Sequence, residues 1–421
     1  MTDRWDVEAF WETRPRVLDR LDQEALFTEG ALFDLACTAA ARRATLPDPQ
    51  DVRVFAGDNI VNPSMVEAYL PSRAIDGDFA GYAERLRARA GSFALTINSL
   101  QQFGWELWRA LRRQVDPVLA AVPAPPAGGV DCHLIASAYG TAPTLVHKDT
   151  AGVFTYVVSG FKRYYTWPFE VFADLAGGEA TQRQVNLPAS VRYQDHLDTA
   201  TVVEAGPGSV LYWPSDRWHC ATSDGDLAVS LHLAHYRWED RLALLTRRLQ
   251  RSAAAELGIR RFAGGALPDQ VTGDGPGDPR PVDARIREVV ARLLDDQGLD
   301  LDLRLRRARR QTSSDFEVVP PLRPCAELGT EDRLTVPAES AVRTVDVDGE
   351  TYLAVNGHVL RVRGGAWLDA FLPSLAPGTS RPFARWEEFA QAAGGPSGGE
   401  FAFLMREMVK RGALDHGEVA A

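Results

Sequence analysis

Three residues that could share one metal ion lie in two separate segments of the chain. His147 and Asp149 belong to VHKDTAGVFTYVV, and His219 follows much later in GSVLYWPSDRWHCATS. Side chains alternate along a strand, so an H-x-D triplet places imidazole and carboxylate on one face and Lys148 on the other. Two ligands on one strand and a third from a distant strand can form one face of an octahedral metal. This donor set leaves the opposite face open, which suits Fe(II) that must also bind a cosubstrate and O₂.

An H-x-D triplet also arises by chance, so the prediction of a metal site depends on the context of His219, which supports it. A glycine turn, an apolar strand and a proline turn deliver His219 to the start of the next strand. Strand alternation should point the neighbouring Cys220 away from the metal. His133, His196 and His235 have no partners at ligand spacing, and we expect structural or surface roles for them.

Short strands must position these residues. After the breaker PAPPAGG at 123–129, the segment 130–238 alternates β-branched and aromatic residues, as in HLIASAY, VFTYVV and AVSLHLAHY, between turns rich in Gly, Pro, Asp and Ser. This texture predicts an antiparallel barrel or jelly roll rather than a parallel sheet with crossover helices.

Helical patterns flank the predicted strands. The first 120 residues are expected to be mainly helical, with amphipathic stretches at 17–43 and 78–118 separated by a Pro-containing segment at 46–64. After residue 238, RLALLTRRLQRSAAAELG and ARIREVVARLLDD predict a helical connecting region, with a Gly/Pro/Asp linker at 264–281. Its apolar stripes could pack internally or against a second copy of the chain.

The last segment predicts a small domain with a β-hairpin and helices. In VRTVDVDGETYLAVNGHVLRV the DG and NG dipeptides stand between alternating apolar positions, as hairpin turns do. Helices are expected at 366–375, 385–393 and 399–412. The domain resembles the winged-helix type, but its net charge between 338 and 421 is −3, which argues against DNA binding.

Composition excludes several classes of protein. The 421 residues carry a net charge of −11, which disfavours a general binder of nucleic acid or anionic membranes. An apolar fraction of 45% excludes global disorder. The four cysteines are far apart, so no disulfide framework or thiolate zinc site is indicated. No apolar run is long enough to span a membrane, and a reducing cytoplasm is the expected location.

At this point the sequence resembles a known family. The two metal segments are similar to those of the Jumonji-C branch of the cupin-type Fe(II)/2-oxoglutarate oxygenases, in particular the ribosomal-oxygenase group of protein hydroxylases. FWETRP at 10–15 resembles the group's aromatic-Trp-x-x-(Lys/Arg)-Pro motif. Ser137 and Tyr139 stand in a strand that usually reads Asn-x-Tyr-x-Thr, with Ser137 replacing an asparagine near the cosubstrate.

The resemblance also implies a role for Lys162. In the family, a basic residue fifteen positions after the first histidine pairs with the distal carboxylate of 2-oxoglutarate. Lys162 occupies that position, and it is one of only three lysines beside 43 arginines. If Ser159 and Gly160 form a two-residue hairpin loop, Val157 faces Lys162. A straight strand from Asp149 to Val157 would then place Lys162 too far from the metal ligands for one cosubstrate molecule to reach both. The chain must therefore bend at 150–152.

The resemblance implies an α+β fold in four parts. These are a helical N-terminal cover (1–125), a double-stranded β-helix or jelly-roll core of the cupin/JmjC type (126–238), a helical connecting and dimerisation domain (239–335) and a C-terminal winged-helix-like domain (336–421). His232, in the SLH-type ending of the last core strand, could line the pocket or be a satisfied barrel histidine.

The expected function is hydroxylation of an amino-acid side chain, in a protein or peptide, by an Fe(II)/2-oxoglutarate-dependent homodimer. His147, Asp149 and His219 would hold the metal, and Lys162, Ser137 and Tyr139 the cosubstrate. Two alternatives stay open: a tailoring oxygenase of a free amino acid or small natural product, and a non-catalytic cupin scaffold that dimerises.

Overall fold

The computed structural model describes residues 5–19, 27–46, 48–176, 184–238 and 296–417, together with residues 284, 287, 288 and 291. The predicted helices and linker between 239 and 295 therefore lie almost wholly outside the described residues. The described elements before the connecting region are β1 Arg16–Asp19, α1 Glu29–Arg42, β2 Val52–Ala56, β3 Asn59–Ile60, α2 Arg73–Asp76, α3 Phe79–Ala90, β4 Phe93–Ile97, α4 Trp105–Ala121, β5 Gly129–Ala138, β6 His147–Lys148, β7 Ala151–Ser159, β8 Lys162–Trp167, α5 Ala173–Ala176, β9 Val185–Asn186, β10 Thr201–Ala205, β11 Ser209–Trp213, β12 Trp218–Thr222 and β13 Ala228–Tyr236.

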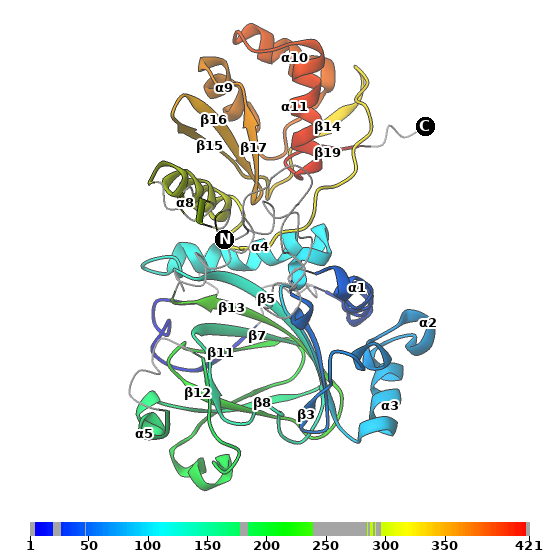
Figure 1. Cartoon of the computed structure of the whole chain (residues 1–421), viewed down its shortest axis with the longest axis vertical. Helices are drawn as coiled ribbons and strands as arrows, with labels where there is room; N and C mark the ends of the chain where they lie inside the picture. The colour runs from blue at the N-terminus through cyan, green and yellow to red at the C-terminus, as the bar shows by residue number, and fades with distance from the viewer. Residues whose placement is uncertain are drawn as a thin grey trace.

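Two antiparallel sheets face each other in this part of the molecule (Figure 1). The larger sheet has the order β1-β11-β7-β13-β5-β4-β2-β3, and the smaller has the order β10-β8-β12-β6-β9. From β5 to β8 and again from β11 to β13, each strand lies in the opposite sheet from the one before it. The predicted mixture of helices and antiparallel strands is confirmed.

The N-terminal part contributes strands as well as helices, which corrects the prediction of a mainly helical cover. The predicted helix at 17–43 is preceded by β1, which pairs with β11, and only α1 is helical in its described part. The predicted helix at 78–118 is interrupted by β4. Gly91, with φ of +75°, ends α3, and the following FALTI pairs with β5. The segment 46–64 also holds the paired strands β2 and β3.

Helices cover the outer face of the larger sheet. Leu95 of β4, Leu134 of β5 and Leu231 of β13 share one buried core with Leu107 and Leu111 of α4, and α1 and α3 add to it. The side chains that alternate with these leucines face the smaller sheet and form a second core between the sheets. The candidate site lies in this interior.

The C-terminal part has its own core. Its elements are α8 Asp296–Gln311, β14 Arg333–Thr335, β15 Val342–Val347, β16 Glu350–Val355, β17 His358–Val362, α9 Ala366–Phe371, β18 Ser380–Pro382, α10 Phe383–Ala392, α11 Gly398–Lys410 and β19 Asp415–His416.

The predicted turns and helices of this part are present. Asp348-Gly349 and Asn356-Gly357 have positive φ at both positions and join β15, β16 and β17. Helices α9, α10 and α11 agree with the three predicted helices within a few residues. Among the described residues, no helix is both long and apolar enough to cross a membrane.

Candidate metal centre and buried lysine

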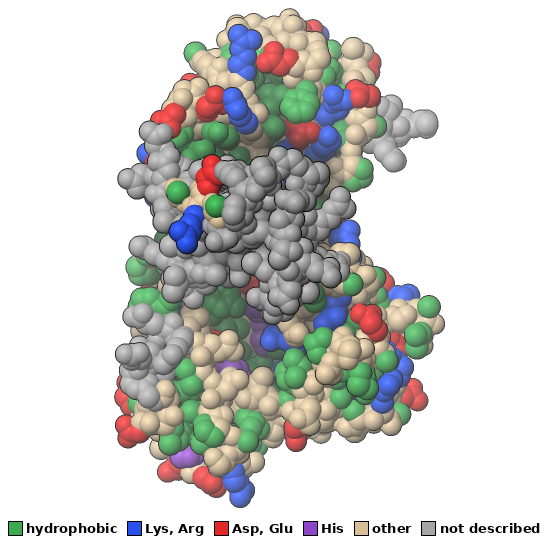
Figure 2. All heavy atoms as spheres, in the orientation of Figure 1, with side chains coloured by type: hydrophobic (Ala, Val, Ile, Leu, Met, Phe, Trp, Pro, Cys, Tyr) green, Lys and Arg blue, Asp and Glu red, His purple; other side chains and the backbone are tan. Residues whose placement is uncertain are grey.

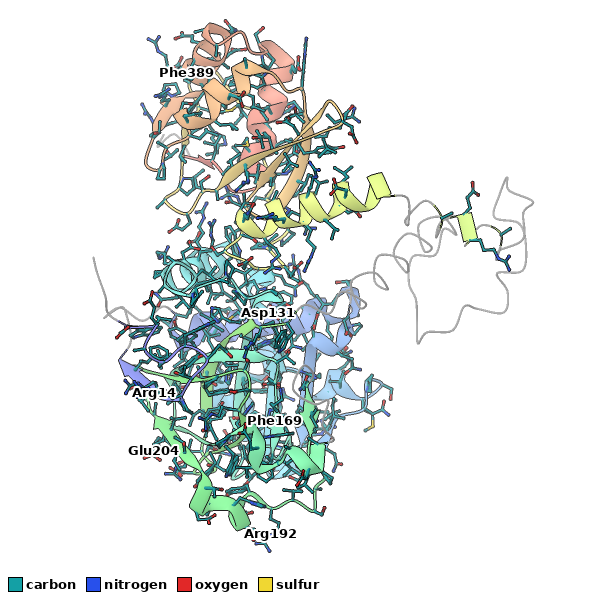
Figure 3. The ribbon with its side chains drawn as sticks, turned by 90° about the vertical axis from the view of Figure 1, so that its left-hand side faces the viewer. Arg14, Asp131, Phe169, Arg192, Glu204 and Phe389 are labelled. Atoms are coloured by element: carbon teal, nitrogen blue, oxygen red, sulfur yellow. The ribbon has the colours of Figure 1, made fainter. Side chains whose placement is uncertain are left out.

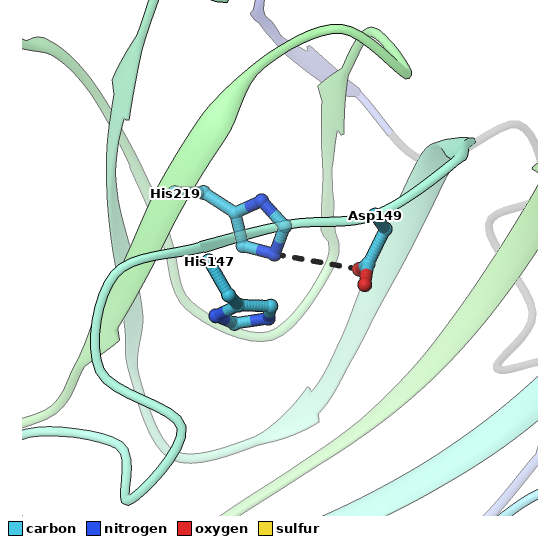
Figure 4. Close-up of side chains that lie close together, drawn as sticks. All are labelled: His147, Asp149 and His219. Carbon is cyan, nitrogen blue, oxygen red and sulfur yellow. Dashed lines mark ion pairs between the residues drawn. The ribbon is translucent and has the colours of Figure 1, made fainter. Parts of the chain in front are cut away.

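Strand register brings the two predicted metal-ligand histidines together. His147 of β6 lies directly opposite His219 of β12 in the smaller sheet. Asp149 follows β6, where the chain leaves this sheet and enters β7 in the larger one. The three side chains converge in Figure 4. Figure 2 shows histidine side chains inside a recess on one face of the molecule.

The distances suit a single cation. One ligand atom from each of His147, Asp149 and His219 lies within 4.8 Å of the others, the one such group found among the described residues. Nε2 of His219 lies 3.5 Å from Oδ2 of Asp149, and the two imidazole centroids are 4.2 Å apart. Ligands of one ion show similar separations, since their bonds to it are about 2.0–2.2 Å long.

Backbone carbonyls orient both imidazoles. Nδ1 of His147 lies 3.1 Å from the carbonyl oxygen of Leu145, and Nδ1 of His219 lies 3.4 Å from that of Arg217. A carbonyl oxygen can only accept, so each Nδ1 carries a hydrogen, and Nε2 is the ring atom that is left to face a metal. Histidine ligands of metals are commonly held in this way.

The electrostatics of the three side chains match a divalent ion. Burial, followed by the proximity of His147, lowers the pKa of His219 to about 3, so its imidazole is neutral near pH 7. Burial opposes ionisation of Asp149, but His147 and His219 outweigh it and lower the pKa of the carboxyl group. The set therefore offers the neutral imidazole of His219 and the carboxylate of Asp149.

Lys162 is completely buried and points into the same interior. Its Nζ donates to Oγ of Ser137 at 2.6 Å and to the Tyr139 hydroxyl at 3.1 Å. It also lies 4.7 Å from the centroid of the Tyr139 ring. An ammonium has three donors, and none of the described carboxylates lies within ion-pair distance of this one. The structure thus brings together all three residues expected to hold the cosubstrate.

The expected hairpin between Val157 and Lys162 is wrong. β7 pairs with β11 and β13 in the larger sheet, whereas β8 pairs with β10 and β12 in the smaller one. Gly160, with φ of +75°, lies where the chain crosses between the sheets, and a Cβ there would lie 2.2 Å from the Leu227 carbonyl oxygen. Lys162 instead belongs to β8, which pairs with the strand β12 that carries His219 in the smaller sheet. Thr166 is the register partner of His219, and Lys162 precedes Thr166 by four residues, about 13 Å along β8.

Aromatic residues that the sequence analysis did not single out form walls of the site. The ring of Trp213 lies 5.1 Å from that of His219, and the ring of Tyr164 lies 6.3 Å from it. Tyr164 stands two positions from Lys162 on the same strand, so alternation could have indicated it. His232 is buried among them, 3.2 Å from Thr155 Oγ1 and 3.0 Å from Ser230 Oγ. Both of its ring nitrogens have hydroxyl partners, so it is a satisfied histidine that packs beside the Tyr164 and Trp213 rings.

The remaining predictions about individual side chains agree with the geometry. Cys220 belongs to a core on the outer side of the smaller sheet, and burial raises the pKa of its thiol to about 12. The thiolate that a metal would bind is thus disfavoured near pH 7. His133 lies 3.0 Å from Oδ1 of Asn98, whereas His196 and His235 pack edge-on against aromatic rings. None of these three histidines belongs to the metal group.

Comparisons with known proteins give structural similarity alone. No protein-family model matches the sequence, and no curated protein is significantly similar to it. The structure of YcfD, a ribosomal oxygenase from Escherichia coli, in complex with cobalt and 2-oxoglutarate is 15% identical, with a TM-score of 0.49. The similarity covers 98% of this chain and 97% of that chain.

Other solved structures give the same picture. A crystal structure of the E. coli ribosomal oxygenase YcfD is 16% identical over the same shares of both chains, with a TM-score of 0.49. A complex of YcfD with cobalt and succinic acid is 15% identical, with a TM-score of 0.47. Structural neighbours over the full length are thus ribosomal oxygenases, the group whose motifs this sequence resembles.

Proposed function

We propose that this chain is an Fe(II)- and 2-oxoglutarate-dependent oxygenase that hydroxylates an amino-acid side chain in a protein or peptide. One observation carries the proposal: a fully buried ammonium, Lys162, has only neutral hydroxyl partners and faces the interior that holds the group of two histidines and a carboxylate. A buried charge without a counter-charge is costly, so the site is built to receive an anion.

Each side chain has a defined task in this proposal. His147, Asp149 and His219 would hold the ion, and their donor set suits a first-row divalent metal with open positions. Lys162 and Tyr139, supported by Ser137, would bind the distal carboxylate of 2-oxoglutarate. A bound Fe(II) ion supplies, with 2-oxoglutarate and O₂, the oxidation of an unreactive C–H bond.

The aromatic walls keep water from the reacting groups. Trp213 and Tyr164 are almost fully buried beside His219, and the low-dielectric surroundings strengthen the contact of Lys162 with an anion. The overall reaction would convert a C–H bond, O₂ and 2-oxoglutarate into an alcohol, succinate and CO₂.

We further propose a jelly-roll interpretation of the two facing sheets and a winged-helix-like interpretation of residues 336–421. The alternation of successive strands between the sheets supports the first, and the three-stranded β15-β16-β17 sheet beside α9, α10 and α11 supports the second. A homodimer through the segment 239–335 is also proposed. Light scattering at micromolar concentration should return twice the chain mass of 46.2 kDa.

A reducing, cytoplasmic setting is part of the proposal. All four cysteines are free thiols, and Cys132 and Cys220 are buried. Their separation in the fold agrees with a chain that does not depend on disulfides.

The decisive experiment supplies purified protein with Fe(II), 2-oxoglutarate and ascorbate, and measures succinate with and without candidate substrates. Mass spectrometry then seeks one added oxygen atom on peptides and, separately, on free amino acids. Oxidised peptide supports the proposal, whereas oxidised free amino acid alone supports the tailoring alternative. Absence of both metal binding and 2-oxoglutarate turnover would favour the non-catalytic scaffold.

A further inference from the structure

A second cavity lies far from the metal group, where the barrel meets the C-terminal part. It has a volume of about 650 Å³ and lies between α4, α8 and β15. Figures 1 and 3 both show α8 between the two parts of the molecule. The residues that line it are Arg112, Asp116, Leu119, Pro125, Leu303, Arg306, Arg307, Arg310, Gln311, Ser314, Asp315 and Arg343.

The lining is strongly basic. It holds five arginines and two aspartates, although the whole chain carries a net charge of −11. Two of the arginines are neutralised locally, since Arg306 pairs with Glu317 and Arg310 pairs with Asp315 at 2.9 Å.

Two other arginines stay without a counter-charge. Arg307 of α8 and Arg343 of β15 are exposed, and neither forms an ion pair with any described carboxylate. They come from segments that are separate in sequence but line the same cavity. An arginine fork matches the oxygens of phosphate or carboxylate groups.

Arg112 supplies a fixed, buried cation at the same place. Its Nε donates to Oγ of Ser314 at 2.8 Å, and its Nη1 lies 3.3 Å from Oδ1 of Asn356. These contacts hold the guanidinium beside the cavity, and the nearest described carboxylate, Asp116, is 4.0 Å from Nε. The cavity is therefore lined by a positioned, buried cation as well as by two exposed arginines.

A smaller cavity of about 330 Å³ adjoins the first and shares Gln311 and Arg343 with it. Leu372 and Leu375 give it an apolar side, whereas the hydroxyls of Thr312 and Ser340 donate to the backbone carbonyls of Ala308 and Ala413. The apolar body of an organic ligand fits here, next to the basic cavity.

We propose that these neighbouring cavities bind a small phosphate monoester, with the phosphate between Arg112, Arg307 and Arg343 and the organic body against Leu372 and Leu375. A phosphate monoester carries about −1.5 to −2 charges at pH 7, which the two unpaired arginines balance. The site is independent of the metal group, so its ligand would act on the contact between the two parts of the molecule rather than on the reaction.

Isothermal titration of the full chain with AMP and with adenosine tests the proposal in the absence of metal. AMP should bind saturably with one site per chain, and adenosine should not bind. Arg307→Gln and Arg343→Gln should each weaken AMP binding about tenfold or more, because each removes a charge-assisted contact. Both residues are exposed, so thermal melts of the variants should match the parent protein.

Arg304→Gln is the matched control. Arg304 lies on the same helix, pairs with Asp300 and does not line either cavity. Its replacement makes the same charge change and should leave AMP binding unaltered. The proposal is overturned if AMP does not bind, if all three variants weaken it equally, or if only RNA or heparin binds with steep salt dependence. That last result would assign the surface to nucleic acid.

Discussion

Nζ of Lys162 donates a 2.6 Å hydrogen bond to Oγ of Ser137, and this contact joins the smaller sheet to the larger one across the interior. Lys162 belongs to β8 and Ser137 to β5. Tyr139, two positions after Ser137 on the same side of the chain, provides the second acceptor. Two of the three ammonium donors are thus fixed from one direction, which leaves the third for a ligand.

Lys162→Ala should raise the apparent KM for 2-oxoglutarate by tens-fold to thousands-fold. Removing one partner of a buried charge pair costs about 2–5 kcal/mol. Metal affinity should stay nearly unchanged, and Lys162→Arg should restore function only in part because the guanidinium is wider. Steady-state kinetics and titration of 2-oxoglutarate measure both effects.

Lys410→Ala is the matched control for the lysine change, since Lys410 pairs with Glu407 in the C-terminal part. It should leave the KM for 2-oxoglutarate as it is. An unaltered KM in Lys162→Ala would remove the cosubstrate role and leave the oxygenase proposal resting on the metal group alone.

Tyr139→Phe should have a smaller effect on the same constant. The change removes one hydroxyl acceptor of Lys162 but keeps the ring beside the ammonium. A single hydrogen bond contributes about 0.5–1.5 kcal/mol, so the affinity for 2-oxoglutarate should fall about twofold to tenfold. A loss as large as that of Lys162→Ala would show that Tyr139 does more than orient the lysine.

Asp149→Ala should abolish metal binding and turnover without unfolding the chain. The Asp149 side chain is 31% exposed, so its removal takes away a ligand and little core volume. Calorimetric titration with Mn²⁺ or Co²⁺ and a thermal melt measure the two properties separately. Asp198→Asn, at an exposed position in the 3-10 helix Tyr193–Thr199, is the control, and retained tight metal binding by Asp149→Ala would contradict the assignment.

Cys220→Ala should reduce stability and leave metal affinity unchanged. Cys220 is adjacent to His219 in sequence, but its side chain lies in the outer core with Trp167 and Trp218. Loss of this buried group should cost about 1 kcal/mol in the free energy of unfolding. Urea denaturation and metal titration distinguish the two effects, and weaker metal binding with unchanged stability would reverse the interpretation.

Asp415→Asn should destabilise the chain in a pH-dependent way. Oδ1 of Asp415 accepts from Arg109 at 2.7 Å and from Arg323 at 2.8 Å, so the carboxylate links α4 to the C-terminal part. Partial burial opposes its ionisation, but these hydrogen bonds prevail and lower the pKa of Asp415 below 3.8. The stabilisation is therefore present above about pH 4 and is lost as the pH falls through the lowered value.

At pH 7 the variant should lose about 1 kcal/mol of unfolding free energy, since the pair is partly exposed, and the difference should shrink toward pH 3. Urea denaturation at several pH values measures this trend. Glu388→Gln breaks an exposed pair with Arg385 and should change stability little at any pH. A pH-independent difference for Asp415→Asn would mean that its charge is not the stabilising feature.

Strand alternation made the metal group predictable. Alternation placed His147 and Asp149 on one face, because period-two patterns survive in short, half-buried strands, whereas His219 was added from its local context and the family resemblance. The N-terminal strands could not be found in this way. β4 reads FALTI, and such an apolar run does not differ from a buried helical segment until its partner β5 is known.

The route to Lys162 was also beyond the sequence. A glycine after Ser159 fits a hairpin as well as a crossing between sheets, and local turn chemistry does not distinguish them. Pairing between distant strands decides between a hairpin and a crossing, because β7 pairs with β11 and β13 while β8 pairs with β10 and β12. The family position of Lys162 pointed to a residue that lies buried in the interior between the sheets, although the predicted path to it was wrong.

The exchange of successive strands between the two sheets has a consequence for how the protein matures. A nascent chain that has emerged only as far as β8 contains His147 and Asp149 but neither His219 nor the β13 strand that pairs with β5. In such a chain, the interior that Lys162, His147 and Asp149 face in the finished fold has not yet formed. Such non-local pairing forms late and slowly. A metal ion at this group would therefore enter a finished barrel rather than guide its assembly, and under the proposed function the supply of metal should affect activity after synthesis without changing the yield of folded chain.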